Sequence, residues 1–400
     1  MHSSLYKRWR SLGFAVLLSF TAVSLVQGQD VYKEFNTEVA GEYRYFFNSG
    51  NYPNQHQNYF SIKIEPELLL EWDDGRQQLN FTGFLRLDRD DRRTHADIRE
   101  LYWLIARNNW ELSVGLKKVF WGVTESIHLV DIINSTDIVE SFDGEEKLGQ
   151  PMVHFSYVSK IGTIDLFALP YTRRPQFPGS EGRLRTPFII DGSEAGFESG
   201  SEEYRPTFAT RWSNSIGVFD IGLSHFYGNG REPLFDVASE SVFYPVNHQT
   251  GLDIQATTGP FLWKFEAIRR DNKFQEVYAL AGGFEYTFSN IRDSGIDIGI
   301  LGEYLYDNRD DLAISGMDND LFVGSRIAFN DTQSSQILAG AIFDLSKSTQ
   351  LWSIEAERRI GSSWKASVEM RLFEKVAREE FLLYALRQDS FAQFTISKFF

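Results

Sequence analysis

Serine, histidine and acidic residues are the side chains with which this sequence could build a hydrolytic site. Ser126 stands two positions before His128, and His95 stands two positions before Asp97. A nucleophilic serine needs a histidine base oriented by an acid, and such short spacings do not encode that geometry. Neither G-x-S-x-G nor H-E-x-x-H occurs, and the absence of cysteine excludes thiol nucleophiles and thiolate metal ligands. We therefore expect no enzymatic activity, no cofactor and no metal site.

The long segment 119–150 carries polar residues at a regular spacing. Two aspartates and an asparagine follow one another at three-residue intervals, and a tryptophan-glycine pair precedes them. The carboxylate and amide oxygens could cap a turn or short helix, or they could contact a passing solute or cation. The tryptophan would anchor the segment, and the glycine would let its backbone bend into a lumen. The candidates for a pore constriction are Trp121, Gly122, Asp131, Asn134 and Asp137.

Apolar and polar residues alternate along nearly the whole chain after residue 30. Leu79, Phe81 and Leu85, for example, fall on one face of a strand whose other face carries Thr82 and Arg86. In a membrane barrel the apolar face meets lipid and the polar face lines the lumen. The charged wall residues could set ion preference, or they could simply pair across strands. The wall candidates are Arg86, Arg99, Lys117, Arg211, Lys264, Glu266, Glu355, Glu369 and Arg371.

The alternating segments predict an all-β protein, a transmembrane antiparallel barrel of about 18 strands. Sixteen strands remain an alternative, because the pair within 151–169 is the least regular. The predicted strands are 35–47, 58–72, 77–88, 97–106, 110–118, 151–159, 162–169, 205–213, 216–228, 248–258, 261–270, 276–288, 294–306, 319–330, 334–345, 349–360, 363–374 and 389–399.

The connections between these segments alternate between short and long. Tight turns are predicted at 73–75, 107–109, 213–215, 257–260, 330–331 and 361–363, whereas the long loops are 119–150, 170–204, 229–247, 307–318 and 375–388. Short periplasmic turns and long extracellular loops are typical of outer-membrane barrels. The third loop, 119–150, is expected to fold into the lumen.

Tryptophans collect at one end of the predicted strands, as an interfacial belt would require. Trp72, Trp103, Trp110, Trp212, Trp263 and Trp364 lie beside the short turns, and only Trp352 lies at the opposite end.

Residues 1–28 have the features of a signal peptide. Three basic residues precede an apolar stretch of 15 residues, Leu12 to Val26, which is too short for a confident membrane span. We expect cleavage before Gln29, leaving residues 29–400 as one barrel domain. Removal of residues 1–28 takes away three basic residues and no acidic residue, so the net charge of −15 becomes −18. So acidic a chain is a poor partner for nucleic acid.

Three motifs carry a resemblance to a known group of proteins. They are Arg99-Glu100-Leu101-Tyr102, the stretch from Gly115 through Lys117-Lys118 to Trp121-Gly122, and the stretch Asp131 to Asp137. Together they resemble an uncharacterised porin-like family of Gram-negative outer-membrane β-barrels. Ser135 departs from the family, which commonly has proline there, and we expect a looser turn at this position. The alternating C-terminus ending on Phe400 resembles the closing strand that the barrel-assembly machinery recognises, although Lys398 departs from its pattern.

The resemblance and the patterning together predict a porin-like outer-membrane channel for small solutes. Expected partners are outer-membrane lipid and lipopolysaccharide, the barrel-assembly machinery and a small-molecule solute; the oligomeric state stays open. One alternative is a transporter of hydrophobic compounds or a component of an export system. Another is a structural or adhesive barrel with a plugged lumen. The first alternative needs apolar residues on the lumenal face, for which the candidates are Phe84, Leu101, Phe226 and Leu301.

Overall fold

Eighteen strands form one antiparallel sheet in the computed structural model, which describes residues 31–141, 143–310, 313 and 316–400. The predicted signal peptide, residues 1–28, lies outside the described residues. The strands are β1 (Tyr32–Phe46), β2 (Asn58–Trp72), β3 (Gln77–Leu87), β4 (His95–Ala106), β5 (Trp110–Lys117), β6 (Gln150–Ser159), β7 (Gly162–Leu169), β9 (Thr207–Ile216), β10 (Phe219–Asn229), β13 (Val246–Thr258), β14 (Phe261–Asp271), β15 (Glu276–Phe288), β16 (Asp297–Asp307), β17 (Asn319–Ala328), β18 (Gln336–Asp344), β19 (Gln350–Ile360), β20 (Trp364–Glu374) and β21 (Phe391–Phe399).

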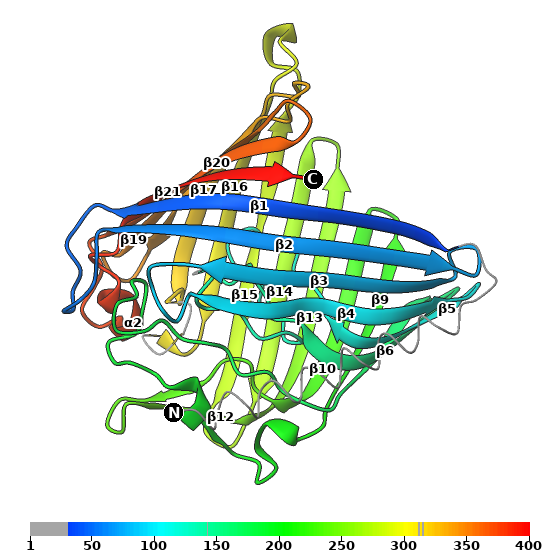
Figure 1. The fold of residues 1–400 in the computed structure, drawn as a ribbon, viewed down its shortest axis with the longest axis horizontal. Coiled ribbons are helices and arrows are strands. Elements are labelled where there is room, and N and C mark those ends of the chain that lie inside the picture. The colour runs from blue at the N-terminus through cyan, green and yellow to red at the C-terminus, as the bar shows by residue number, and fades with distance from the viewer. Residues whose placement is uncertain (1–30, 142, 311–312, 314–315) are drawn as a thin grey trace.

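The sheet closes into a barrel because its first and last strands pair (Figure 1). β1 runs antiparallel to β21, from Glu38 opposite Phe399 to Phe46 opposite Phe391. The backbones of Thr37 and Phe400 extend this seam with two further hydrogen bonds, at 3.0 and 3.3 Å. The prediction of an 18-stranded antiparallel barrel is confirmed, and closure leaves no strand edge free to pair with another chain.

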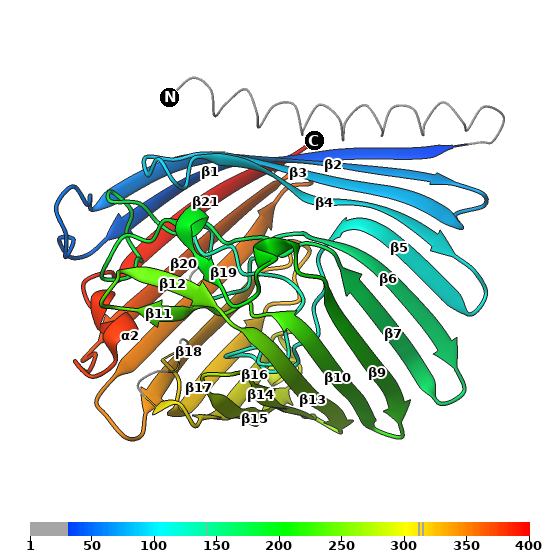
Figure 2. The same ribbon diagram turned by 90° about the horizontal axis from the view of Figure 1, so that it is seen from below.

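Short turns gather at one end of the barrel and long connections at the other (Figure 2). The third loop, residues 118–149, and the fourth, residues 170–206, are the longest connections. We call the two ends the turn side and the loop side. Both β1 and β21 have their terminal ends on the turn side, as the alternation of connections predicted.

The predicted turn at 213–215 is wrong. β9 continues to Ile216, which pairs with Phe219, so only Gly217 and Val218 form the turn. Gly217 has a φ of +65°, the left-handed conformation that a two-residue hairpin needs and that glycine adopts without strain.

A β-bulge in β4 corrects one assignment of a residue to the lumen. The β3–β4 register shifts between Thr82 and Gly83, which leaves an extra residue, Arg99, on β4. Beyond the bulge, Leu101 shares a face with Trp103, which is 43% exposed on the outside. The expectation that Leu101 points inward is therefore wrong.

The outer surface of the barrel is apolar, as a lipid-facing wall must be. Phe60, Val114 and Ile396 are exposed there by 59%, 44% and 54%, and in water such a surface would aggregate. Two tryptophan indoles on the turn side have polar partners: Trp263 Nε1 donates to Thr258 Oγ1 at 2.9 Å, and Trp212 Nε1 donates to Ile161 O at 2.7 Å. This is the arrangement expected of a side chain at a membrane interface.

Lys398, which departs from the usual closing-strand pattern, reaches the turn-side interface. Its ammonium donates to Ser363 Oγ at 2.7 Å and lies 5.0 Å from the Trp364 ring and 5.6 Å from the Phe400 ring. A lysine can snorkel in this way while its methylene stem stays on the apolar face.

The loops carry small elements of their own. A second sheet joins β8 (Gly196–Phe197), β11 (Leu234–Asp236) and β12 (Ser241–Tyr244), and the last loop holds the short helix α2 (Phe381–Ala385). Single 3₁₀ turns span Gly192–Glu194, Glu202–Tyr204 and Ile291–Asp293. No helix in the described part of the chain is long and apolar enough to cross a membrane.

The fourth loop runs across the loop side and fastens to the barrel seam. The Arg183 guanidinium pairs with Asp389 at 2.7 Å and donates to the carbonyls of Asn48, His56 and Gln388. Both members of the ion pair are nearly inaccessible to water, so this contact holds the loop firmly over the mouth.

A closed barrel should resist unfolding by detergent. We expect the protein to migrate differently on a dodecyl sulfate gel before and after boiling, because no strand can fray without breaking two neighbouring ladders. Identical mobility of boiled and unboiled samples would contradict the closed sheet.

Candidate functional site

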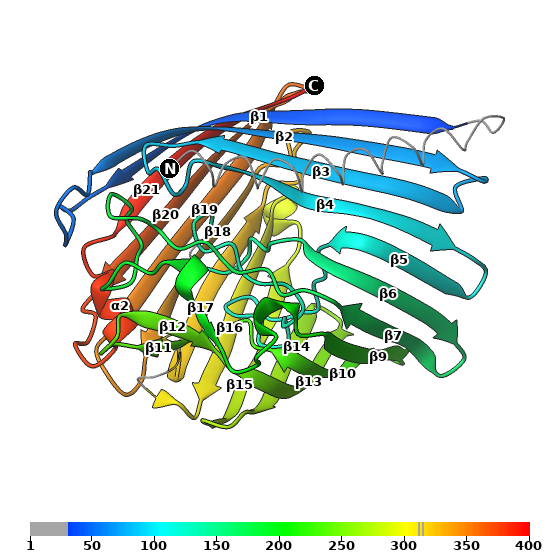
Figure 3. The same cartoon turned by 60° about the horizontal axis from the view of Figure 1, so that its bottom comes forward.

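The third loop folds as a hairpin inside the ring of strands (Figure 3). Its two legs are joined by backbone hydrogen bonds, from Asp137 N to Glu146 O at 2.8 Å and from Leu148 N to Ser135 O at 2.9 Å. The expectation that the third loop enters the lumen is confirmed by this placement.

Asn134 ties together the two ends of the hairpin. Its Oδ1 accepts from Val119 N, and its Nδ2 donates to the carbonyls of Lys117 and Leu148, all at 2.9 Å. The side chain is 3% exposed, so all of these bonds serve the shape of the loop.

The Trp121-Gly122 pair forms the packed base of the hairpin. Trp121 is 8% exposed and packs edge-on against Phe167, and its backbone N–H donates to Asp131 Oδ1 at 2.7 Å. A Cβ at Gly122 would stand 2.3 Å from His128 Nδ1, so the glycine is needed for close approach. Asp131 thus acts in this structure as a brace for the backbone.

An apolar core fills the lumen between the hairpin and the wall strands β6, β7, β9, β10, β14 and β15. Phe226 and Ile268 are inward-facing wall residues of this core; Phe226 is covered by it, whereas Ile268 also lines a cavity on the loop side. Phe84, by contrast, lies outside this core and stacks beneath the Arg99 guanidinium at 4.1 Å. The core consists of Trp121, Val130, Ile132, Ile133, Met152, Phe167, Leu169, Ala209, Phe226, Ile268 and Ala279.

Two glutamates, one on β14 and one on β16, hold the hairpin in place. Glu266 on β14 accepts three backbone N–H groups and one hydroxyl, and Glu303 on β16 accepts two backbone N–H groups and one hydroxyl, at 2.6–3.1 Å. The donors belong to Val123, Thr124, Glu125, Ser126 and Val130. Both glutamates are at most 2% exposed, and charge-assisted bonds of this kind each contribute about 1.5–3 kcal/mol.

Glu125 forms a third anchor on the same wall. Its carboxylate pairs with Lys264 Nζ at 3.1 Å and with Arg326 Nη2 at 2.7 Å. Burial would raise the pKa of Glu125, but the two cations outweigh it and lower the pKa below its ordinary value. The anchor therefore stays charged at neutral pH.

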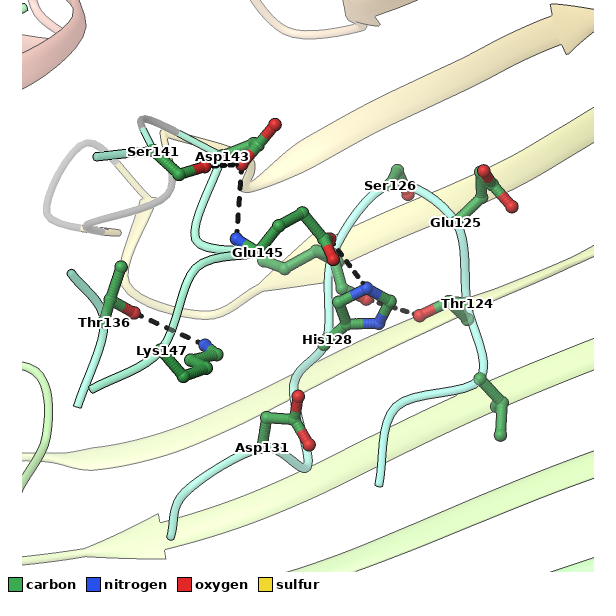
Figure 4. A network of polar contacts seen from close by, with 12 residues as sticks. Thr124, Glu125, Ser126, His128, Asp131, Thr136, Ser141, Asp143, Glu145 and Lys147 are labelled. Carbon is green, nitrogen blue, oxygen red and sulfur yellow. Dashed lines mark hydrogen bonds and ion pairs between the residues drawn. The ribbon is translucent and has the colours of Figure 1, made fainter. Parts of the chain in front are cut away.

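His128 bridges the hairpin legs through its ring (Figure 4). Nε2 lies 2.9 Å from the Glu145 carboxylate, while Nδ1 lies 3.9 Å from Glu266 and interacts with it through charge. Burial opposes protonation, but the two carboxylates raise the pKa of His128 to about 10. The imidazolium is therefore charged at neutral pH, and the stabilisation it brings is full below the ordinary histidine pKa of about 6.5 and is lost as the pH rises from there through about 10.

Arginines on β3 and β4 pair with acidic residues in the second half of the hairpin. Arg99 Nη1 lies 2.5 Å from Asp137 Oδ2, and both side chains are 2% exposed. Arg86 bridges Glu140 at 2.8 Å and Glu42 at 3.1 Å. Asp137 is consequently a buried partner of the wall.

The hairpin tip, by which we mean Ser141 and Asp143, meets the barrel wall at Arg371. Its Nη2 lies 2.6 Å from Asp143 Oδ2 and 2.6 Å from Glu355 Oε1, and its Nε donates to Glu369 at 3.0 Å. Three carboxylates thus surround one guanidinium at the point where the tip comes closest to this wall.

Cavities lie on both sides of the hairpin tip. The turn-side chamber, of about 500 Å³, is bounded by β1–β4, β17–β21 and the tip. The loop-side vestibule, of about 310 Å³, lies between the hairpin and the outer loops. Ser141 and Asp143 line both cavities, so the tip is a wall shared by the two.

The two cavities differ in charge. Among the described residues, the lining of the turn-side chamber has ten acidic and seven basic side chains. The vestibule lining has four acidic and five basic side chains, with His128 in addition. The chamber is therefore negative and the vestibule weakly positive.

The other wall candidates lie away from the tip. Arg211 pairs with Asp253 through both of its terminal nitrogens, at 2.5 and 2.7 Å. Lys117 Nζ lies 3.2 Å from Ser113 Oγ and 3.3 Å from His154 Nδ1. Both contacts join side chains close to the base of the hairpin.

Sequence reasoning missed Glu125, Glu303 and Arg326 as functional residues. Glu303 falls on the predicted polar face of its strand, which was the one available signal. Its role as an anchor depends on contact with the third loop, where Ser126 lies 177 residues away in sequence.

The possible hydrolytic residues are engaged elsewhere. Ser126 Oγ donates to Glu303 at 2.6 Å, and His95 Nε2 lies 3.9 Å from both Asp137 and Glu140. Within the described residues, histidine and acidic side chains form no group arranged to hold a metal ion.

Comparisons with known proteins agree on the fold. OccK5 (OpdH) of Pseudomonas aeruginosa is similar over 92% of this chain and 97% of its own, with a TM-score of 0.55 at 11% identity. Wzi of Escherichia coli, an outer-membrane protein described as a carbohydrate-binding β-barrel involved in group 1 capsule assembly, is similar over 91% and 83%, with a TM-score of 0.53 at 10% identity. No protein-family model matches the sequence, and no curated protein sequence does. The fold class is therefore a closed, 18-stranded antiparallel β-barrel.

Proposed function

We propose that the protein is an outer-membrane channel in which small solutes pass the tip of the third loop. The observation that carries this proposal is the shared wall between two cavities: Ser141 and Asp143 line the turn-side chamber and the vestibule alike. The apolar core fills the lumen on the opposite side, so the route would run along β1–β4 and β17–β21.

The apolar outer wall and the tryptophans near the turns support a location in the bacterial outer membrane. Lipid and lipopolysaccharide would then contact the barrel, and Phe400 at the seam would serve the barrel-assembly machinery as its signal. Phe400 is 70% exposed, which leaves its ring accessible for recognition.

A plugged structural barrel is the second candidate, because the hairpin is anchored on both walls. The acidic chamber favours the channel: a plug needs no water-filled space lined by seventeen charged side chains. Transport of hydrophobic compounds, or a part in an export system, has less support, since the apolar core covers Phe226 and the chamber lining is highly charged.

Single-channel recording in planar bilayers tests the proposal. We expect discrete conductance steps and a reversal potential, in a salt gradient, that indicates preference for cations, because the chamber lining carries a net negative charge. Insertion of folded protein without any conductance would favour the plugged barrel.

A further inference from the structure

The loop-side vestibule contains buried positive charge that no carboxylate of the described chain neutralises. Arg231 is 8% exposed and lines this cavity. Its Nε donates to Ile133 O at 2.9 Å, and its Nη1 donates to Thr172 Oγ1 and Asn229 O at 3.2 and 3.1 Å. Its Nη2 is buried without a hydrogen-bond partner, and no ion pair joins Arg231 to an acid in the part of the chain that is described.

The neighbouring arginines use the nearby acids. Arg270 and Arg309 both pair with Glu232, at 2.6 and 3.1 Å, and Arg309 also pairs with Asp307 at 2.5 Å. Two guanidinium groups therefore engage the two nearby carboxylates, and Arg231 is left without an acidic partner among the described residues.

Arg185 repeats this feature on another side of the same cavity. It is 7% exposed, its Nη1 donates to the carbonyls of Thr186 and Pro187, and its Nε is buried without a partner. The guanidinium lies 3.7 Å from the centre of the Tyr52 ring, and it makes no ion pair with a described residue. An isolated buried cation is unfavourable unless an anion approaches it.

The remaining walls of the vestibule are largely apolar. Such a cavity, of about 310 Å³, is at the lower end of the range for small-molecule sites. Apolar walls favour a ligand with a hydrophobic body, and guanidinium groups favour a planar oxyanion. The apolar lining includes Phe177, Leu184, Phe235, Ile268, Leu305 and Leu386.

We propose that the vestibule is a binding site for a small organic anion, a carboxylate attached to an apolar body, drawn in by Arg231 and Arg185. The site goes beyond the proposed channel function: it would hold an anion in the weakly positive vestibule above the hairpin, whereas the negative chamber below favours cations. A ligand carboxylate would supply the negative charge that the described lining lacks, and its apolar part would displace water from the vestibule.

Equilibrium dialysis of labelled phenylacetate against the protein in lipid nanodiscs, with empty nanodiscs as blank, tests the site. We expect saturable binding of phenylacetate, binding at least about tenfold weaker for the neutral isostere phenylacetamide, and weaker binding of acetate, which lacks the apolar body. Equal binding of phenylacetate and phenylacetamide would overturn the proposal, as would the absence of saturable phenylacetate binding.

Variants locate the site. Arg231→Gln and Arg185→Gln should each weaken phenylacetate binding severalfold, whereas Arg205→Gln, which removes a half-buried arginine outside the vestibule lining, should leave it unchanged. Heat-modifiable mobility on a gel checks that each variant is folded. If Arg231→Gln misfolds, the comparison of phenylacetate with phenylacetamide on the wild-type protein still tests whether the site binds an anion. Equal losses in all three variants would overturn the assignment.

The outcome separates the site from the channel, because dialysis does not depend on conduction. A conducting protein that fails to bind phenylacetate would refute the site alone. Binding without conductance would refute the channel alone.

Discussion

Replacing Glu266 and Glu303 together by alanine should raise single-channel conductance severalfold and make the open current noisier. The two carboxylates accept seven hydrogen bonds from the hairpin, and without them five backbone N–H groups and two hydroxyls lose their partners. Each charge-assisted bond contributes about 1.5–3 kcal/mol, so their joint loss should loosen this part of the hairpin from the wall although the Glu125 ion pairs remain. The released segment would then leave a wider passage.

The matched control is Glu276→Ala, which removes an exposed glutamate on β15 outside the lumen. Its conductance should equal that of the wild type. An unchanged conductance in the folded Glu266→Ala, Glu303→Ala variant would mean that the hairpin does not limit permeation.

Removing charge from the wall around Arg371 should abolish most of the cation preference. Glu355→Gln and Glu369→Gln together change the net charge of the described chamber lining from −3 to −1 and leave Arg371 with Asp143 as its remaining acidic partner. Charges facing a confined, low-dielectric pore act more strongly on an ion than charges in bulk water. The reversal potential in a salt gradient should therefore move toward zero.

Salt concentration provides an internal check on this electrostatic origin. The screening length is about 10 Å at 0.1 M and about 3 Å at 1 M, so the difference between wild type and variant should shrink as salt rises. Glu276→Gln should leave the reversal potential unchanged. A double variant with wild-type selectivity at low salt would place the ion path elsewhere.

Charge reversal at Asp131 or Asp137 is a poorer probe of selectivity than the sequence suggested. Asp137 is buried against Arg99, and Asp131 holds the backbone of Trp121. A lysine at either position would leave a buried group unpaired and disturb the hairpin itself, so changes in conductance would report shape rather than charge.

Local patterns in the sequence sufficed to predict the strands of the barrel wall and, for most of their residues, the inward or outward face. Alternation decides the face of each residue, as at Arg86 and Arg371, both of which meet the hairpin inside the lumen. The pattern failed at Leu101, where the bulge at Arg99 reverses the faces, and at 213–215, where Gly217 makes the tighter turn. Each failure came from a single residue that alters the register or the turn.

Contacts inside the lumen could not be predicted in the same way. The sheet of β8, β11 and β12 joins strands of two to four residues from different loops, none of which has a periodicity of its own. The anchors at Glu266 and Glu303 depend on the path of a loop far away in the chain. Such pairings are set by tertiary packing, and the sequence gives no local sign of them.

Modification of one introduced thiol at the hairpin tip tests most directly whether solutes pass there. The chain has no cysteine, so Ser141→Cys creates a single reactive site on the wall shared by the two cavities. We expect a charged methanethiosulfonate reagent to reduce the single-channel current of this variant, and to leave unchanged both the wild type and Ser348→Cys, an exposed position in a loop-side turn. Complete labelling at position 141, verified by mass, with an unaltered current would contradict permeation past the third loop.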